Sequence, residues 1–274
     1  MADIYLTVSE HVSEYLTKKY STSFGMASSL FGSDIRSDIY NVYGFVRIAD
    51  EIVDTYAGAD SLKILDQFEQ QTYQDLARGY STNPVVHAFV HTCQKTGIGK
   101  DLIAPFIQSM RMDTVEHPYT TDKYKEYIYG SAEVVGLMCL KVFCKGDDAQ
   151  YKVLAPGAQA LGRAYQKVNF LRDIKDDYQR LGRYYFPVGT FESFDETIKA
   201  EIITDIRADF AAAHKAIVKL PANAQKAVTA SYVYFTRLLD LVEKTPAADL
   251  RQRRVRLPDT IKLQLLLRVK LGLI

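Results

Sequence analysis

The chain has 274 residues, of which 47% are hydrophobic and 24% are charged. This is enough apolar material for a sizeable core. With a formal net charge of +1, the overall charge does not indicate binding to nucleic acid or to an anionic membrane. The three cysteines, Cys93, Cys139 and Cys144, fit neither a disulfide framework nor a zinc site, which is typical of a reduced, cytosolic protein.

The beginning of the chain, MADIYLTVSEHVSEY, contains no basic segment followed by an apolar run, so the sequence predicts no signal peptide. No stretch approaches about 18 uncharged apolar residues, so it predicts no membrane-spanning segment.

Helical periodicity dominates the chain. Apolar residues recur at steps of three and four in segments 37–56, 61–80, 168–187 and 197–220. Strand-like alternation is scarce, and the turn signals are short, for example STNP at 81–84 and CKGDD at 144–148. These patterns predict one all-α domain over residues 1–274, with roughly ten helices joined by short connections.

Aspartates four residues apart occur in four places. The pairs are Asp34/Asp38, Asp50/Asp54, Asp173/Asp177 and Asp205/Asp209. Such a pair most often marks a solvated helix face, and we expect this for Asp205/Asp209, in a charged amphipathic helix. Asp34/Asp38 follows the turn sequence FGS and is expected at a helix start, where the helix dipole stabilises carboxylates.

The other two pairs lie in acidic stripes that core residues border. One helix face would carry Tyr43, Arg47, Asp50 and Asp54, with Glu51 beside it, and a second would carry Gln166, Asn169, Asp173 and Asp177. Like charges one turn apart repel each other, so either this face is solvated or a positive group lies against it.

Two such stripes facing each other would form a cage of carboxylate oxygens and one amide oxygen. These are the ligands that magnesium prefers, usually together with phosphate oxygens of a substrate. Arg47, Arg172 and Arg183 would then donate hydrogen bonds to a phosphate group.

Five segments, in this order, resemble elements of the squalene/phytoene synthase family, the head-to-head trans-prenyl transferases. They are YSTSF at 20–24, RIADEIVD at 47–54, YIYGSAEVVGLMCLKVF at 127–143, NFLRDIKDDYQRLGRYYFP at 169–187 and RRVRLPDTIK at 253–262. The second and fourth are similar to the family's two aspartate-rich motifs. The elements cover nearly the whole chain, and the resemblance is greatest to bacterial phytoene synthases.

The resemblance implies an isoprenoid-synthase α-fold with a central cavity. It implies that magnesium, or manganese, is held by Asp50, Glu51, Asp54, Asn169, Asp173 and Asp177. It implies that the substrate is bound by Ser21, Phe24, Arg47, Gln166, Asn169, Arg172, Arg183, Tyr185 and Arg254. Catalytic roles are implied for Arg47, Tyr127 and the four motif aspartates. Glu51 stands where many members have aspartate, and Thr22 where lysine is common, which affects one potential phosphate contact.

The implied reaction is a magnesium-dependent head-to-head condensation of two geranylgeranyl diphosphates through a cyclopropyl diphosphate. It gives phytoene, the first committed product of carotenoid biosynthesis, and needs no organic cofactor. A dehydrosqualene- or squalene-type synthase acting on farnesyl diphosphate is the alternative, because substrate length depends on cavity-floor side chains that form no local motif. An inactive member acting as an assembly or binding protein is a third hypothesis, which the retained metal ligands disfavour.

Three other segments carry patterns that are typical of other functions. His87 and His91 could form a zinc pair, but the glutamate of a zinc protease is replaced by Ala88. RQRRVR is expected to be solvated apart from Arg254, so no nucleic-acid partner is expected. The segment IKLQLLLRVKLGLI at 261–274 is amphipathic and favours core packing over membrane contact. Peripheral membrane contact for product release stays open beside a cytoplasmic location, and the oligomeric state is not predicted.

Overall fold

The structure is a computed structural model that describes residues 3–56, 58–114 and 120–273, with all their side chains except those of 22–24. Within this part the secondary structure is helical and contains no strand, which confirms the predicted all-α class. The first helices are α1 (Ile4–Tyr20), α2 (Thr22–Ser28), α3 (Arg36–Asp50), α4 (Ser61–Arg78), α5 (Pro84–Thr96), α6 (Lys100–Met112) and α7 (Thr121–Ile128). They are followed by α8 (Val134–Cys144), α9 (Asp148–Leu181), α10 (Glu196–Ile217), α11 (Ala222–Lys244), α12 (Ala247–Leu250) and α13 (Asp259–Lys270).

Two short segments are π-helical rather than α-helical. They are η1 (Glu51–Tyr56), which continues α3, and η2 (Tyr129–Glu133), which joins α7 to α8. π-Helical turns are rare and occur frequently at functional sites. Both of these are continuous with helices that carry residues of the predicted site.

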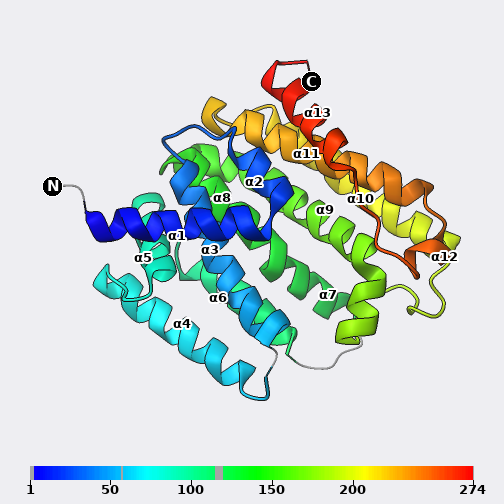
Figure 1. The fold of residues 1–274 in the computed structure, drawn as a ribbon, viewed down its shortest axis with the longest axis horizontal. Helices are drawn as coiled ribbons and strands as arrows, with labels where there is room; N and C mark the ends of the chain where they lie inside the picture. The colour runs from blue at the N-terminus through cyan, green and yellow to red at the C-terminus, as the bar shows by residue number, and fades with distance from the viewer. Residues whose placement is uncertain (1–2, 57, 115–119, 274) are drawn as a thin grey trace.

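The long helix α9 runs through the middle of the molecule (Figure 1). It packs against α8 and η2 on one side and against α10 on the other, while α3 packs against α1, α5 and α8. In Figure 1 the helices α10, α11 and α13 lie on one side of α9, and α1, α3, α4 and α5 lie on the other. The segment of α3 with η1 and the second half of α9 thereby come to the same region, although Asp50 and Asp173 are 123 residues apart in the sequence.

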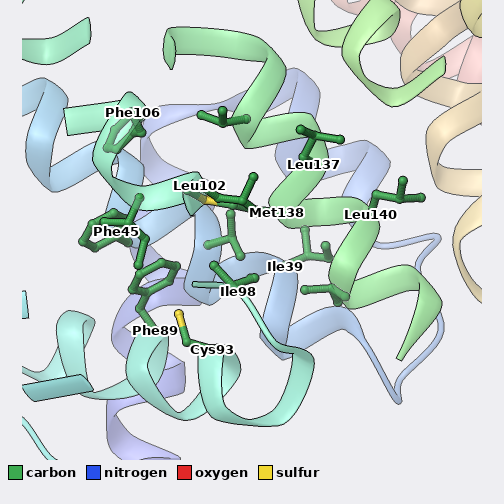
Figure 2. Close-up of a cluster of buried hydrophobic side chains, with 14 of the residues drawn as sticks. Ile39, Phe45, Phe89, Cys93, Ile98, Leu102, Phe106, Leu137, Met138 and Leu140 are labelled. Atoms are coloured by element: carbon green, nitrogen blue, oxygen red, sulfur yellow. The ribbon is translucent and has the colours of Figure 1, made fainter. Parts of the chain in front are cut away.

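One hydrophobic cluster holds α3 in place by packing against one face of it (Figure 2). Phe45 of α3 and Phe89 of α5 are fully buried and stack with ring centroids 4.0 Å apart, and Phe106 of α6 lies 5.8 Å from Phe45. Burial of each such ring contributes about 1.5–3 kcal/mol. The opposite face of α3 is thereby left for the polar residues of the site.

Close approach of η2 and α8 to α9 depends on glycine. A Cβ atom on Gly162 would lie 2.5 Å from the carbonyl oxygen of Ala132, and one on Gly136 would lie 2.8 Å from that of Ala158. Any side chain at either position would push the helices apart. These glycines therefore set how closely η2 and α8 pack against the first half of α9.

The bounds of one predicted helix need correction. The predicted helix over 168–187 is the end of a helix that begins at Asp148 and stops at Leu181, where Gly182 has φ of 66° and turns the chain. The continuous run Thr121–Cys144 is 24 residues long and contains one window that is long and apolar enough, by length and composition alone, to cross a membrane. Two thirds of its apolar window (67%) is buried in the protein, as in the core helix of a globular domain.

Candidate active site

A cavity of about 740 Å³ lies between α3, α8, α9 and α11. Along α9 its lining changes from apolar residues, such as Leu154 and Leu161, to polar residues that end with Asp177. At 1.5 Å per residue, Leu154 and Asp177 are about 35 Å apart along the helix axis. The lining of α3 changes in the same direction, from Ile39 to Asp50. The cavity therefore has one apolar end and one charged end.

The first acidic stripe lies at the junction of α3 and η1. Asp50 is the last residue of α3 and Asp54 lies in η1, and both line the cavity. Because η1 is π-helical, the α-helical angles assumed from the sequence do not apply between these two residues. Glu51 does not line the cavity, and its carboxylate pairs with Arg47 instead. This geometry does not support Glu51 as a metal ligand.

Asp50 is surrounded by other acidic groups. Its side chain is 30% exposed and lines the cavity. The pKa of Asp50 is raised to about 8, mainly by burial and then by the neighbouring charge of Asp54. The opposite effect of Arg47 on this pKa is smaller than the effect of Asp54. A cation placed here would relieve both the desolvation and the repulsion.

The second stripe follows the last turns of α9. Gln166, Asn169, Asp173 and Asp177 all line the cavity, as the sequence predicts. Asp173 accepts hydrogen bonds from Arg172 at 2.9 Å and pairs with Arg254 at 2.6 Å. Burial, and then the charge of Asp173, raise the pKa of Asp177 to about 7. The structure thus places all four predicted residues on the cavity wall.

Arginines lie between the carboxylates of the charged end. Arg183 pairs with Asp54 at 3.1 Å and with Asp113 at 3.3 Å, so it links η1 to the residues that follow α9. Arg47 pairs with Asp50 at 3.8 Å, and its guanidinium stacks on the Tyr20 ring at 4.2 Å. Among the described residues, no three carboxylate, histidine or cysteine side chains form a ready metal-binding group. The acidic charge is instead balanced by arginine.

One donor at this end has no acceptor. The Nε atom of Arg47 is buried and makes no hydrogen bond within the described part of the chain. A buried donor without a partner costs about 1–3 kcal/mol. An anion bound beside Asp50 would supply the missing acceptor.

Asp113 lines the cavity but is not among the residues predicted from the sequence. It follows the last residue of α6, is 4% exposed at its side chain, and accepts a hydrogen bond from the Tyr127 hydroxyl at 2.9 Å. The Tyr185 hydroxyl lies 3.5 Å away, and the Asp113 backbone carbonyl accepts from Arg183. Burial raises the pKa of Asp113 to about 7. Because Asp113 has no aspartate four residues away, a search for paired carboxylates could not find it; its place at the end of an apolar helix was the available signal.

Aromatic rings line the region beside the carboxylates. Phe170 and Tyr185 stack with centroids 4.1 Å apart, and Tyr127 lies 5.3 Å from Tyr185. All three line the cavity, and Phe170 was not singled out from the sequence. The predicted residues Ser21, Arg172, Arg183 and Arg254 line it as well. Phe24 belongs to α2, and its side chain lies outside the described part of the structure.

The two remaining aspartate pairs are not simple solvated faces. Asp209 is 9% exposed and pairs with Lys167 at 2.7 Å and with Arg163 at 3.1 Å, whereas Asp205 is 61% exposed at its side chain. Asp38 is also buried, and it accepts from Thr92 at 2.9 Å and from Lys95 at 2.7 Å. The expectation of solvation for Asp209 was therefore wrong. Asp38 lies in the first turn of α3, as expected, but it is also buried and paired. None of these aspartates lines the cavity.

Comparisons with known proteins agree with this arrangement. The family model of squalene/phytoene synthase matches residues 17–260. Phytoene synthase of Arthrospira platensis is 31% identical over 193 residues, 66% of this chain and 62% of that protein, and 4,4'-diapophytoene synthase of Staphylococcus haemolyticus is 27% identical over 71% of this chain and 67% of that protein. The chain thus spans about three fifths of the length of the first curated relative.

A solved dehydrosqualene synthase structure, in complex with a ligand, superimposes with a TM-score of 0.81. The match covers 98% of this chain and 97% of that chain at 23% identity. At this identity the likeness concerns the fold, and it confirms the predicted isoprenoid-synthase architecture. The sequence match and the fold lead to one conclusion: the chain belongs to the squalene/phytoene synthase family.

Proposed function

We propose that this protein is a prenyltransferase that joins two prenyl diphosphates head to head, with geranylgeranyl diphosphate as substrate and phytoene as product. The observation that carries the proposal is the division of one cavity into a charged end and a long apolar end. A prenyl diphosphate is divided in the same way, into an anionic head and an apolar tail.

The residues of the charged end fit magnesium. Asp50, Asp54, Asn169, Asp173 and Asp177 would hold it through oxygen atoms, which are the donors that magnesium prefers. Magnesium is usually bound by one or two carboxylates together with substrate phosphates, so a group of three carboxylates is not required. When bound, magnesium or manganese would neutralise charge on the diphosphate, which makes it a better leaving group.

The arginines would act on the same diphosphate. Arg47 carries a buried Nε donor without an acceptor, and Arg183 and Arg254 are held by carboxylates at the edge of the cavity. A diphosphate oxygen would become a stronger acceptor as the carbon–oxygen bond breaks. Donors held in advance beside that oxygen stabilise the transition state more than the ground state.

The aromatic and apolar walls would protect the carbon fragment. Loss of diphosphate leaves an allylic cation, which the ring faces of Tyr127, Phe170 and Tyr185 can stabilise. The apolar end keeps water away from it. Attack by the double bond of the second substrate, with proton loss, gives a cyclopropyl diphosphate. A second ionisation, a rearrangement and loss of a proton then give the hydrocarbon.

The alternative substrate is farnesyl diphosphate, as in a dehydrosqualene- or squalene-type synthase. The specific observation in its favour is that Phe31 and Phe143 stack, with centroids 5.5 Å apart, among the residues that line the apolar end. The space that these two rings fill is not available to the prenyl chain of a substrate. An inactive assembly protein is disfavoured, because the carboxylates and arginines of the charged end are all retained.

The proposal is tested by product analysis. Purified protein would be incubated with magnesium and equal concentrations of geranylgeranyl and farnesyl diphosphate, and the extracted hydrocarbons identified by mass spectrometry. We expect phytoene and release of diphosphate, and neither from Asp173→Asn. Preference for the shorter hydrocarbon would establish the alternative. Absence of both hydrocarbons and of diphosphate release would overturn the enzymatic proposal.

A further inference from the structure

The helix α13 presents three large apolar side chains to solvent. Leu263, Leu267 and Leu271, the last just after the helix, are 52%, 47% and 71% exposed. At 100° per residue these positions, four apart, fall within an arc of about 80°. Single exposed leucines are common on protein surfaces, but a continuous row of them marks an interaction site.

The opposite face of the same helix belongs to the protein interior. Leu265 and Leu266 line the cavity, and Val269 is 3% exposed. The segment is therefore apolar on two faces, and the amphipathic pattern expected from the sequence was wrong. Figure 1 shows α13, in red, on the outer side of α11. One helix thus separates part of the cavity from the surroundings.

Basic residues flank the exposed leucines. Arg268 and Lys270 lie on α13 on either side of the row, and Arg256 precedes the helix; all three are exposed and form no ion pair among the described residues. The acidic residue nearest to them along the chain, Asp259, is paired with Lys262 at 2.8 Å. Although the whole chain has a net charge of +1, this surface carries a local excess of positive charge.

We propose that the outer face of α13, defined as Leu263, Leu267, Leu271, Arg268 and Lys270, docks on the surface of an anionic lipid bilayer. Leucines flanked by Lys and Arg match the acyl boundary and the headgroups of such a surface. A second copy of the chain fits less well, because a two-fold contact through this face would bring the cations of both copies together. Docking would also place the part of the cavity wall that α13 forms against lipid.

Docking itself does not depend on the proposed reaction. Its benefit to catalysis does rest on the proposed function, since an uncharged hydrocarbon product would leave the cavity into lipid more easily than into water. The test therefore uses binding without substrate, so that failure of docking and failure of the proposed reaction give different results.

The experiment is flotation of the full chain with vesicles of phosphatidylcholine, alone or mixed with phosphatidylglycerol. The triple variant Leu263→Ser, Leu267→Ser, Leu271→Ser should bind mixed vesicles at least ~10-fold more weakly than wild type, since three apolar side chains no longer enter the interface. The control variant Val153→Ser, Val218→Ser changes residues that are 70% and 57% exposed on other helices, and should bind like wild type.

The charges are tested separately. Arg268→Glu, Lys270→Glu should remove the preference for mixed over neutral vesicles, and so should raised salt. Helix content and melting temperature, measured for every variant, would show whether it is folded. Equal flotation of a folded triple variant and wild type, or no flotation of wild type, would overturn the proposal. A wild-type dimer that this triple variant dissociates would also overturn it and assign the face to a second copy.

Discussion

Arg47→Lys separates a catalytic role for Arg47 from a structural one. The guanidinium of Arg47 stacks on Tyr20, pairs with Asp50 and Glu51, and carries a buried Nε donor without an acceptor. Lysine keeps the positive charge but loses the planar fork, the stack and the Nε donor. If Arg47 only balances the negative charge of the acidic stripe in the absence of substrate, lysine should keep most of its contribution.

The structural cost of this change can be bounded. The side chain of Arg47 is 22% exposed, so the lost stack is worth about 0.5–1 kcal/mol and the altered ion pairs about 0–1 kcal/mol. A loss of about 1 kcal/mol lowers the melting temperature by roughly 2–4 °C in a chain of this size. A lost transition-state contact should cost at least ~1.4 kcal/mol, which is a tenfold fall in the rate constant.

The assay is release of diphosphate at saturating geranylgeranyl diphosphate. A matched control is Arg111→Lys, because Arg111 is 27% exposed, also pairs with two carboxylates, Asp66 and Glu69, and does not line the cavity. We expect Arg47→Lys to lower kcat at least ~10-fold and Arg111→Lys to leave kcat within twofold of wild type. A kcat for Arg47→Lys within twofold of wild type would refute the leaving-group role.

Three other changes give sharp expectations. Asp113→Asn should lower kcat/KM about 10-fold, because the charge that holds Arg183 is lost; wild-type kinetics would contradict that role. Burial raises the pKa of Asp50 to about 8 from an unfolded value near 3.9, so the folded state binds an extra proton between these values and loses stability as pH rises through them. In EDTA, the melting temperature should fall from pH 5 to pH 8, and Asp50→Asn should flatten the fall and melt higher at pH 8; equal slopes would show that the pKa shift is absent. Asp205→Ala should change the free energy of unfolding by about 0.5 kcal/mol or less, whereas Asp209→Ala, which leaves buried Lys167 with one exposed partner, should cost about 2–3 kcal/mol in urea titrations. The opposite order would show that the buried pair contributes little.

Much of the site could be predicted because its signals are local. The residues from Gln166 to Asp177 share a face of one helix, and helical periodicity specifies that face without any knowledge of partners. The same periodicity was enough to predict the all-α class. Asp50 and Asp54 both line the cavity, although η1 changes the helical geometry between them.

What the sequence could not show depends on contacts between distant segments. Asp38 and Asp209 look like surface residues until Lys95 and Lys167, 57 and 42 residues away, are placed against them. Asp113 joins the site through the tyrosine hydroxyls of two other segments. The burial of a charge follows from its partners, and neither composition nor spacing identifies those partners.

The central claim is that the two acidic stripes act as one magnesium-dependent diphosphate site. The most direct test is calorimetric binding of an unreactive prenyl thiolodiphosphate, with and without magnesium, to wild type, Asp54→Asn and Asp177→Asn. We predict binding that requires magnesium and that either substitution weakens at least ~10-fold, about 1.4 kcal/mol, since each stripe supplies part of the same site. Equally tight binding in EDTA, or binding that responds to one stripe and not to the other, would contradict the claim.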